Sequence, residues 1–68
     1  MDLPDSLTRD EMGGIRITGH RIDLHHIVEL YHEGYSAEMM HHEFPTLPLA
    51  VIYEVMVYYL ENKADVDA

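Results

Sequence analysis

The fold is decided by residues 23–60, which read DLHHIVELYHEGYSAEMMHHEFPTLPLAVIYEVMVYYL. Apolar side chains in the first part of this stretch recur at positions i, i+3, i+4 and i+7, which is helical spacing: Leu24, Ile27, Val28 and Tyr31. Asp23 is of the type that caps a helix N-terminus, and Gly34 is of the type that ends a helix in a left-handed conformation. The pattern predicts a helix over residues 24–33 with one apolar face.

Two more helices are predicted downstream. Ser36 is placed to cap a short helix over residues 37–43, which the pair Phe44-Pro45 ends because the residue before a proline avoids helical geometry. A third helix is predicted near residues 47–62, with Pro48 in its first turn. A first helix followed by two helices with a tight connection is the layout of a three-helix helix-turn-helix domain.

A short hairpin is predicted before the first helix, because residues 15–17 alternate between apolar and polar. Gly19-His20 suits a two-residue type II′ loop with glycine in its first position. In that register Ile17 pairs with Ile22. The next pair, Arg16 with Asp23, joins opposite charges.

The expected fold class is therefore mainly α: a three-helix, helix-turn-helix-like domain with a short N-terminal β-hairpin. We expect residues 1–12 to be a flexible lead-in, residues 13–63 to form the single domain, and residues 64–68 to be a frayed acidic tail.

Size and charge restrict the function. The 68-residue chain has no cysteine for a disulfide or a thiolate metal site, so self-association, most simply as a homodimer, is the expected way to stabilise so small a core. Thirteen acidic residues against four basic ones give a net charge of -9, which repels nucleic acid. We expect DNA to be bound only weakly, or through a complex with another protein.

The location is also an expectation. Residues 1–10 carry acids, a proline and no apolar run, unlike a signal peptide. The longest apolar stretch, residues 47–60, is too short to span a bilayer and contains Glu54. We expect a soluble, cytoplasmic protein that does not enter the membrane.

The third predicted helix has more apolar surface than one core requires. The expected core stripe consists of Ile52, Val55, Met56, Tyr59 and Leu60. This assignment leaves a second set for a protein interface: Leu49, Tyr53, Val57 and Tyr58. Either the mate in a dimer or a different protein would cover this set. As a DNA recognition helix the segment is implausible, because it has no Arg, Lys, Asn or Gln before Asn62.

Arg16 and Arg21 are half of all the basic charge and both fall in the predicted hairpin. They are candidate contacts for phosphate or for the acidic groups of a partner. The alternative is that they form salt bridges with Asp10, Asp23 or other nearby acids of the same chain.

No metal, cofactor or catalytic site is predicted. His25, Glu29 and His32 share one face of the first helix, but such two-histidine clusters are common and no fixed metal-binding spacing is present. The chain has no cysteine nucleophile and no glycine loop for phosphate, and a domain this small offers no deep pocket. We therefore expect a binding protein and not an enzyme.

Several short motifs occur together in the order typical of one bacterial family. They consist of Gly13, Ile17, Gly19, Arg21 and Ile22, then residues 33–36 (EGYS), then Phe44-Pro45, Leu47 and Leu49. Over residues 7–60 the chain thus resembles the family catalogued as domain of unknown function 433. It departs from the usual pattern at Thr18, His20, Asp23 and Pro48, and His41 stands where relatives usually carry leucine.

The resemblance implies a homeodomain-like three-helix fold and a role as the antitoxin of a type II toxin-antitoxin pair. The toxin implied is a PIN-like ribonuclease, which the antitoxin would neutralise by direct protein binding. A helix-turn-helix transcriptional regulator and an interaction adaptor without a toxin are the alternatives.

Overall fold

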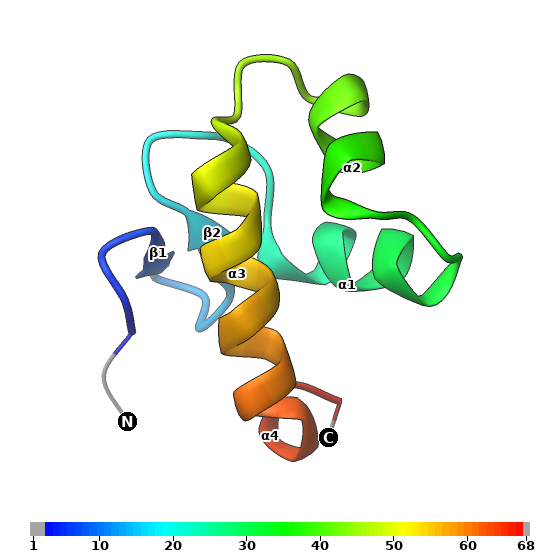
Figure 1. The fold of residues 1–68 in the computed structure, drawn as a ribbon. Coiled ribbons are helices and arrows are strands. Elements are labelled where there is room, and N and C mark those ends of the chain that lie inside the picture. Colours follow the sequence, from blue (N-terminus) through cyan, green and yellow to red (C-terminus); the bar gives the residue numbers. More distant parts are fainter. Residues whose placement is uncertain (1–2, 68) are drawn as a thin grey trace.

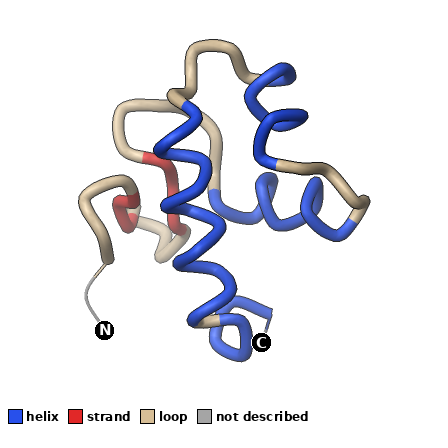
Figure 2. Tube along the Cα trace, in the orientation of Figure 1, coloured by secondary structure: helices blue, strands red, loops and turns tan. Residues whose placement is uncertain are grey.

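The structure is a computed structural model that describes residues 3–67. Its elements, in chain order, are β1 (Leu7–Arg9), β2 (Ile15–Ile17), α1 (Leu24–His32), α2 (Ala37–Glu43), α3 (Leu49–Glu61) and α4 (Lys63–Asp67). Helix α3 runs through the centre, with the two strands on one side and α1 and α2 on the other (Figure 1). Helices dominate, and the strands form only one small antiparallel sheet (Figure 2). The fold is mainly helical with an N-terminal hairpin, as predicted.

The first two helices begin where the sequence predicts. Oδ1 of Asp23 accepts a hydrogen bond from the backbone N–H of His26 at 2.8 Å, which caps α1. Oγ of Ser36 accepts one from the N–H of Met39 at 3.1 Å, which caps α2. After α1 the chain turns at Gly34, whose φ of +93° is a left-handed conformation that favours glycine. These two predictions are confirmed to within one residue.

Helix α3 begins two residues later than predicted. Leu47 lies in the loop before it, fully buried, with its N–H donating to the carbonyl of Phe44 at 2.9 Å. Pro48 is the N-cap and has an extended ψ of 141°. The proline disfavours helical geometry at Leu47, the residue before it, which keeps Leu47 outside the helix.

The partner strand of the hairpin lies where a flexible lead-in was expected. Strand β1 pairs with β2 so that Leu7 faces Ile17, and both side chains are buried. The connecting loop is tight because Oδ1 of Asp10 accepts hydrogen bonds from the N–H groups of Met12 (2.9 Å) and Gly14 (2.8 Å). An apolar pair and an aspartate-stabilised loop thus bring residues 7–9 into the fold.

The predicted pairing on the other side of β2 is also present. The N–H of Ile17 donates to the carbonyl of Ile22 at 2.9 Å. The backbone of Arg16 forms an isolated antiparallel β-bridge with that of Asp23. The predicted type II′ loop at Gly19-His20 was wrong. The N–H of His20 bonds to the carbonyl of Ile17, so Gly19, with a φ of +79°, is the third residue of the turn and not the first of a two-residue loop.

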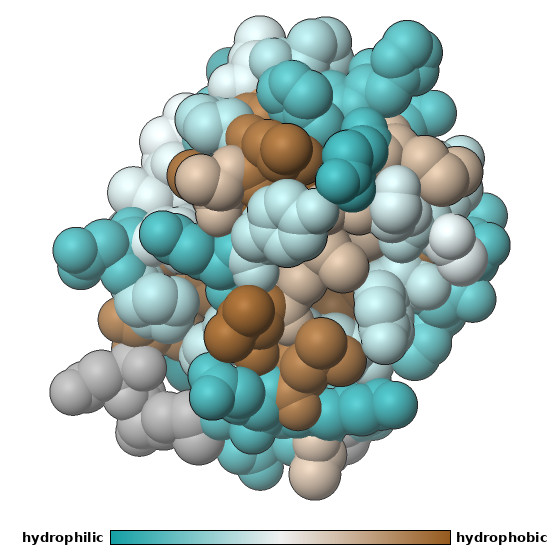
Figure 3. Space-filling view, in the orientation of Figure 1, coloured by the Kyte–Doolittle hydropathy of each residue, from teal (hydrophilic) through white to brown (hydrophobic). Residues whose placement is uncertain are grey.

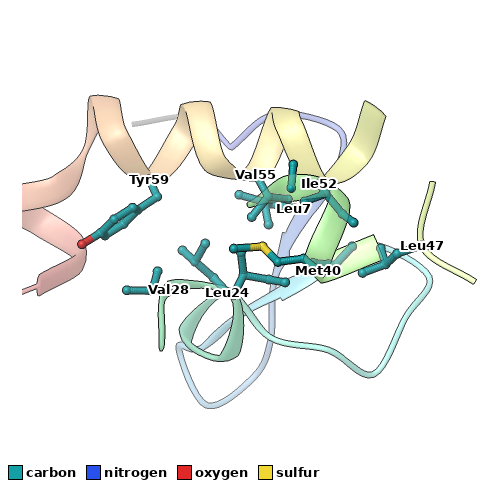
Figure 4. Close-up of a cluster of buried hydrophobic side chains, with 11 residues drawn as sticks. Leu7, Leu24, Val28, Met40, Leu47, Ile52, Val55 and Tyr59 are labelled. Carbon is teal, nitrogen blue, oxygen red and sulfur yellow. The ribbon is translucent and has the colours of Figure 1, made fainter. Parts of the chain in front are cut away.

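A single core lies between α3 and the other elements (Figure 4). Its buried members come from both strands, α1, α2, α3 and the α2–α3 loop: Leu7, Ile17, Leu24, Ile27, Val28, Ala37, Met40, Leu47, Ile52, Val55 and Tyr59. Leu60 was expected in this core but is 50% exposed. It follows Tyr59 by about 100° around the helix, which turns it away from α1. Among residues 3–67, no helix is long and apolar enough to cross a membrane.

The C-terminal residues form a short helix where a frayed tail was expected. Helix α4 follows α3 after a single residue, Asn62, whose N–H bonds to the carbonyl of Tyr58 at 3.0 Å. Both α4 and the N-terminal segment lie near the C-terminal end of α3 (Figure 1). This end of α3 is therefore flanked by both ends of the described chain.

Candidate functional site

The exposed side of α3 carries large apolar side chains in one row. Tyr53, Val57 and Leu60 lie at positions i, i+4 and i+7 and are 46%, 53% and 50% exposed. In the space-filling view, separate hydrophobic side chains lie over α3 among more hydrophilic ones (Figure 3). We call these three residues the α3 row.

The predicted interface residues divide into two pairs. Tyr53 and Val57 are exposed, as the sequence suggested, while Leu49 and Tyr58 are half-buried and pack against the core. Leu60, which was expected in the core, belongs with the exposed pair. Helical periodicity could have found it, because it falls on the same side as Tyr53 and Val57.

An open groove of about 570 Å³ lies between the N-terminal segment and α3. One wall is formed by Leu3 and Pro4. The other wall is formed by side chains of α3 and the residue after it: Tyr53, Glu54, Val57, Tyr58, Glu61 and Asn62. Val57 joins the groove to the α3 row. The contribution of Leu3 and Pro4 was missed because residues 1–12 were read as a lead-in without a packing role.

Charge around the groove is negative. Glu54 and Glu61 line it and are both exposed, and they stand seven residues apart on α3. At a rise of 1.5 Å per residue their Cα atoms are about 10.5 Å apart along the axis. No basic residue lies within α3. The groove is thus lined by apolar side chains and two carboxylates.

Tyr53 is fixed by a contact with the neighbouring helix. Its hydroxyl donates a hydrogen bond to Oε2 of Glu38 in α2 at 2.8 Å. This bond lowers the pKa of Glu38, because it stabilises the carboxylate, and raises the pKa of Tyr53, because it holds the hydroxyl proton. The tyrosine ring is therefore oriented at the surface before any partner arrives.

The arginines lie away from this groove. Arg16 is in β2 and Arg21 is in the loop before α1, and both are exposed. The salt bridges considered for them are not formed within residues 3–67, where the ion pair is His25 with Glu29 at 3.0 Å. The carboxylates of Asp10 and Asp23 instead accept backbone hydrogen bonds. Within the described residues, neither arginine is paired with an acid, so both could contact a partner.

The histidines make contacts within the fold. His25 pairs with Glu29, and Nε2 of His32 lies 2.9 Å from the hydroxyl of Tyr59. Nδ1 of the half-buried His41 donates to the carbonyl of Leu47 at 2.7 Å. This bond offsets the cost of partly burying a polar ring. Within residues 3–67, no three His, Asp or Glu side chains are grouped to hold a metal ion.

A family model described as "Protein of unknown function (DUF433)" matches residues 8–59, from β1 to the last core residue of α3. The chain belongs to the DUF433 family. Neither the curated proteins nor the solved structures that were compared with this DUF433 protein include a match. The matched residues include the α3 row up to Val57. The match does not include Leu3, Pro4, Leu60, Glu61 or helix α4. Part of the groove therefore lies outside the residues that match the family model.

Proposed function

We propose that this DUF433 protein is an antitoxin that neutralises a toxin by direct protein contact, and that it has no catalytic activity of its own. The toxin class that the family resemblance implies is a PIN-like ribonuclease. The observation that carries the proposal is the uncovered apolar row Tyr53, Val57 and Leu60 on a helix without a basic residue.

Exposed apolar and aromatic side chains support protein binding. Binding energy at protein interfaces concentrates in a few large side chains that lose all contact with water. Tyr53 and Val57 of the α3 row are two such side chains, and Tyr53 is held in place by Glu38. A preoriented anchor loses less conformational entropy when it binds.

The charge of the chain favours a basic partner. A ribonuclease binds the phosphates of RNA with a basic surface, and a chain of net charge -9 is attracted to such a surface. Complementary charge mainly speeds association and selects the partner, while the apolar anchors supply affinity. This division of roles matches the apolar side chains and the two carboxylates that line the groove.

The transcriptional regulator is the second candidate, because α2 and α3 have the order of a helix-turn-helix pair. Helix α3 would then be the recognition helix. Its exposed polar side chains, Glu54 and Glu61, carry the charge of the DNA backbone, and its other exposed residues are mainly apolar. These features favour a protein partner over DNA.

Self-association is part of the proposal. Leu60 and the half-buried Met56 fall on the flank of α3 away from Glu54 and Tyr58, given about 100° per residue. A homodimer formed through this flank would cover Leu60 and leave the groove open for a different partner. Such a dimer would also stabilise a chain of only 68 residues.

The experiment is co-expression with the neighbouring reading frame. We expect the neighbour alone to arrest growth, and expect this protein to copurify with it and restore growth. A neighbour that copurifies but is harmless would indicate an adaptor without a toxin. A neighbour that neither copurifies nor arrests growth would contradict the proposal.

A further inference from the structure

We propose that the groove between Leu3–Pro4 and α3 binds a basic amphipathic helix of the partner. Apolar side chains of that helix would lie over Val57 and Tyr58, and its lysines or arginines would pair with Glu54 and Glu61. That the partner is a toxin rests on the function proposed above. That it is a basic helix rests only on the residues that line the groove.

The walls of the groove favour a helix over an extended segment. An added strand needs free backbone N–H and C=O groups along its path. The long wall is α3, whose interior backbone groups bond within the helix. A helical ligand satisfies its own backbone groups and needs only side-chain contacts. The groove supplies such contacts, because its lining consists of two N-terminal residues and one face of α3.

The spacing of the carboxylates fits a helical ligand. Glu54 and Glu61 are two helical turns apart, about 10.5 Å along the axis. Cations seven residues apart on a ligand helix have the same separation. Apolar residues at intermediate positions of that helix would then face Val57 and Tyr58.

A second copy of this chain does not fit the groove. Two-fold contacts bring the same surface patch of both copies together. In the groove, Glu54 and Glu61 of both copies would meet. Like charges brought into one interface destabilise it. The occupant is therefore a cationic partner.

The experiment uses fluorescence anisotropy with the full chain and two synthetic helical peptides. Both peptides carry the same leucine stripe, with lysines seven residues apart in one and glutamates at those positions in the other. We expect the lysine peptide to bind at least about tenfold more tightly. The double variant Glu54→Lys, Glu61→Lys should reverse this preference.

The matched control is the double variant Glu33→Lys, Glu43→Lys. These exposed residues lie outside the groove, and their replacement changes net charge by the same amount. The control should keep the wild-type preference. The proposal is overturned if both variants change the preference equally, if the glutamate peptide binds wild-type protein as tightly, or if the peptide only displaces a second copy.

Two further measurements test the groove independently of the folding of the variants and of the proposed antitoxin role. Amide chemical-shift mapping on wild-type protein should place the lysine peptide at Leu3, Val57 and Tyr58 even if a variant fails to fold, and shifts elsewhere contradict the proposal. A toxin that copurifies unchanged with the Glu54→Lys, Glu61→Lys variant would support the antitoxin role and overturn the groove. Peptide binding without a toxic neighbour would retain the groove and overturn the antitoxin role.

Discussion

The hydroxyl of Tyr59 donates a hydrogen bond to Oδ1 of Asp67 at 3.0 Å, and Nε2 of His32 lies 2.9 Å from the same hydroxyl oxygen. A hydroxyl has one proton to donate, so His32 is the donor in its own contact. The three residues connect α1, α3 and α4 around a ring that is 2% exposed. Burial, followed by the bond to Asp67, raises the pKa of Tyr59.

The first prediction follows from that pKa. Because the pKa of Tyr59 is higher in the folded protein than its ordinary value of 10.0, its contribution to stability is complete below pH 10 and is lost as the pH rises through the folded value. The melting temperature should therefore fall above pH 10. This fall should be smaller in Tyr59→Phe, which should also melt lower at pH 8. Tyr35→Phe removes a hydroxyl far from Asp67 in sequence and should keep the wild-type profile; equal profiles for the two variants would contradict the prediction.

Adjacent methionines in α2 give the second prediction. Met40 is fully buried and Met39 is 49% exposed. Met40→Ala should lower the free energy of unfolding by about 2–5 kcal/mol because it leaves a cavity in the core. Met39→Ala should change it by no more than about 0.5 kcal/mol. Urea unfolding of both variants measures the difference, and equal losses would show that α2 packs on another face.

The third prediction concerns DNA. The free protein should bind duplex DNA no more tightly than about 10⁻⁴–10⁻⁶ M at physiological salt, the range of non-specific binding. The exposed carboxylates Glu54 and Glu61 on α3 repel the phosphates. A mobility-shift titration tests this expectation. Nanomolar, sequence-selective binding by the chain alone would favour the regulator.

The fourth prediction concerns oligomeric state. We expect light scattering at micromolar concentration to give at least a dimer, because Leu60 is half exposed and the core is small. Leu60→Ser should shift the equilibrium toward monomer without loss of helix content. Val57→Ser should have a smaller effect on the dimer, because Val57 lines the groove. A stable wild-type monomer would contradict this prediction.

Local signals in the sequence were sufficient for the helical part of the fold. Asp23 and Ser36 cap α1 and α2 as predicted, since a cap depends on a few neighbouring residues. The core of α1 was predicted for the same reason, because helical spacing shows which side chains share a face. The exposure of Tyr53 and Val57 also followed from this spacing.

Contacts between distant residues were not predictable in this way. Strand β1 forms because Leu7 is buried beside Ile17, ten residues away, and a three-residue strand has no periodicity of its own. The groove wall at Leu3 and the bond between Tyr59 and Asp67 likewise depend on how the chain ends return to α3. Leu60 was misassigned because α3 is apolar on nearly every side, although its helical spacing from Tyr53 and Val57 places it on the exposed face.

The most direct test of the account is the affinity of the copurified partner for the double variant Tyr53→Ser, Val57→Ser, measured by calorimetry. The double variant Arg16→Ser, Arg21→Ser is measured in the same way for comparison. If the α3 row forms the interface, the first variant should bind at least about tenfold more weakly with unchanged helix content, while the arginine variant should bind nearly as wild type does. A folded Tyr53→Ser, Val57→Ser protein that binds the partner as tightly as wild type would contradict the account and would direct attention to Arg16 and Arg21.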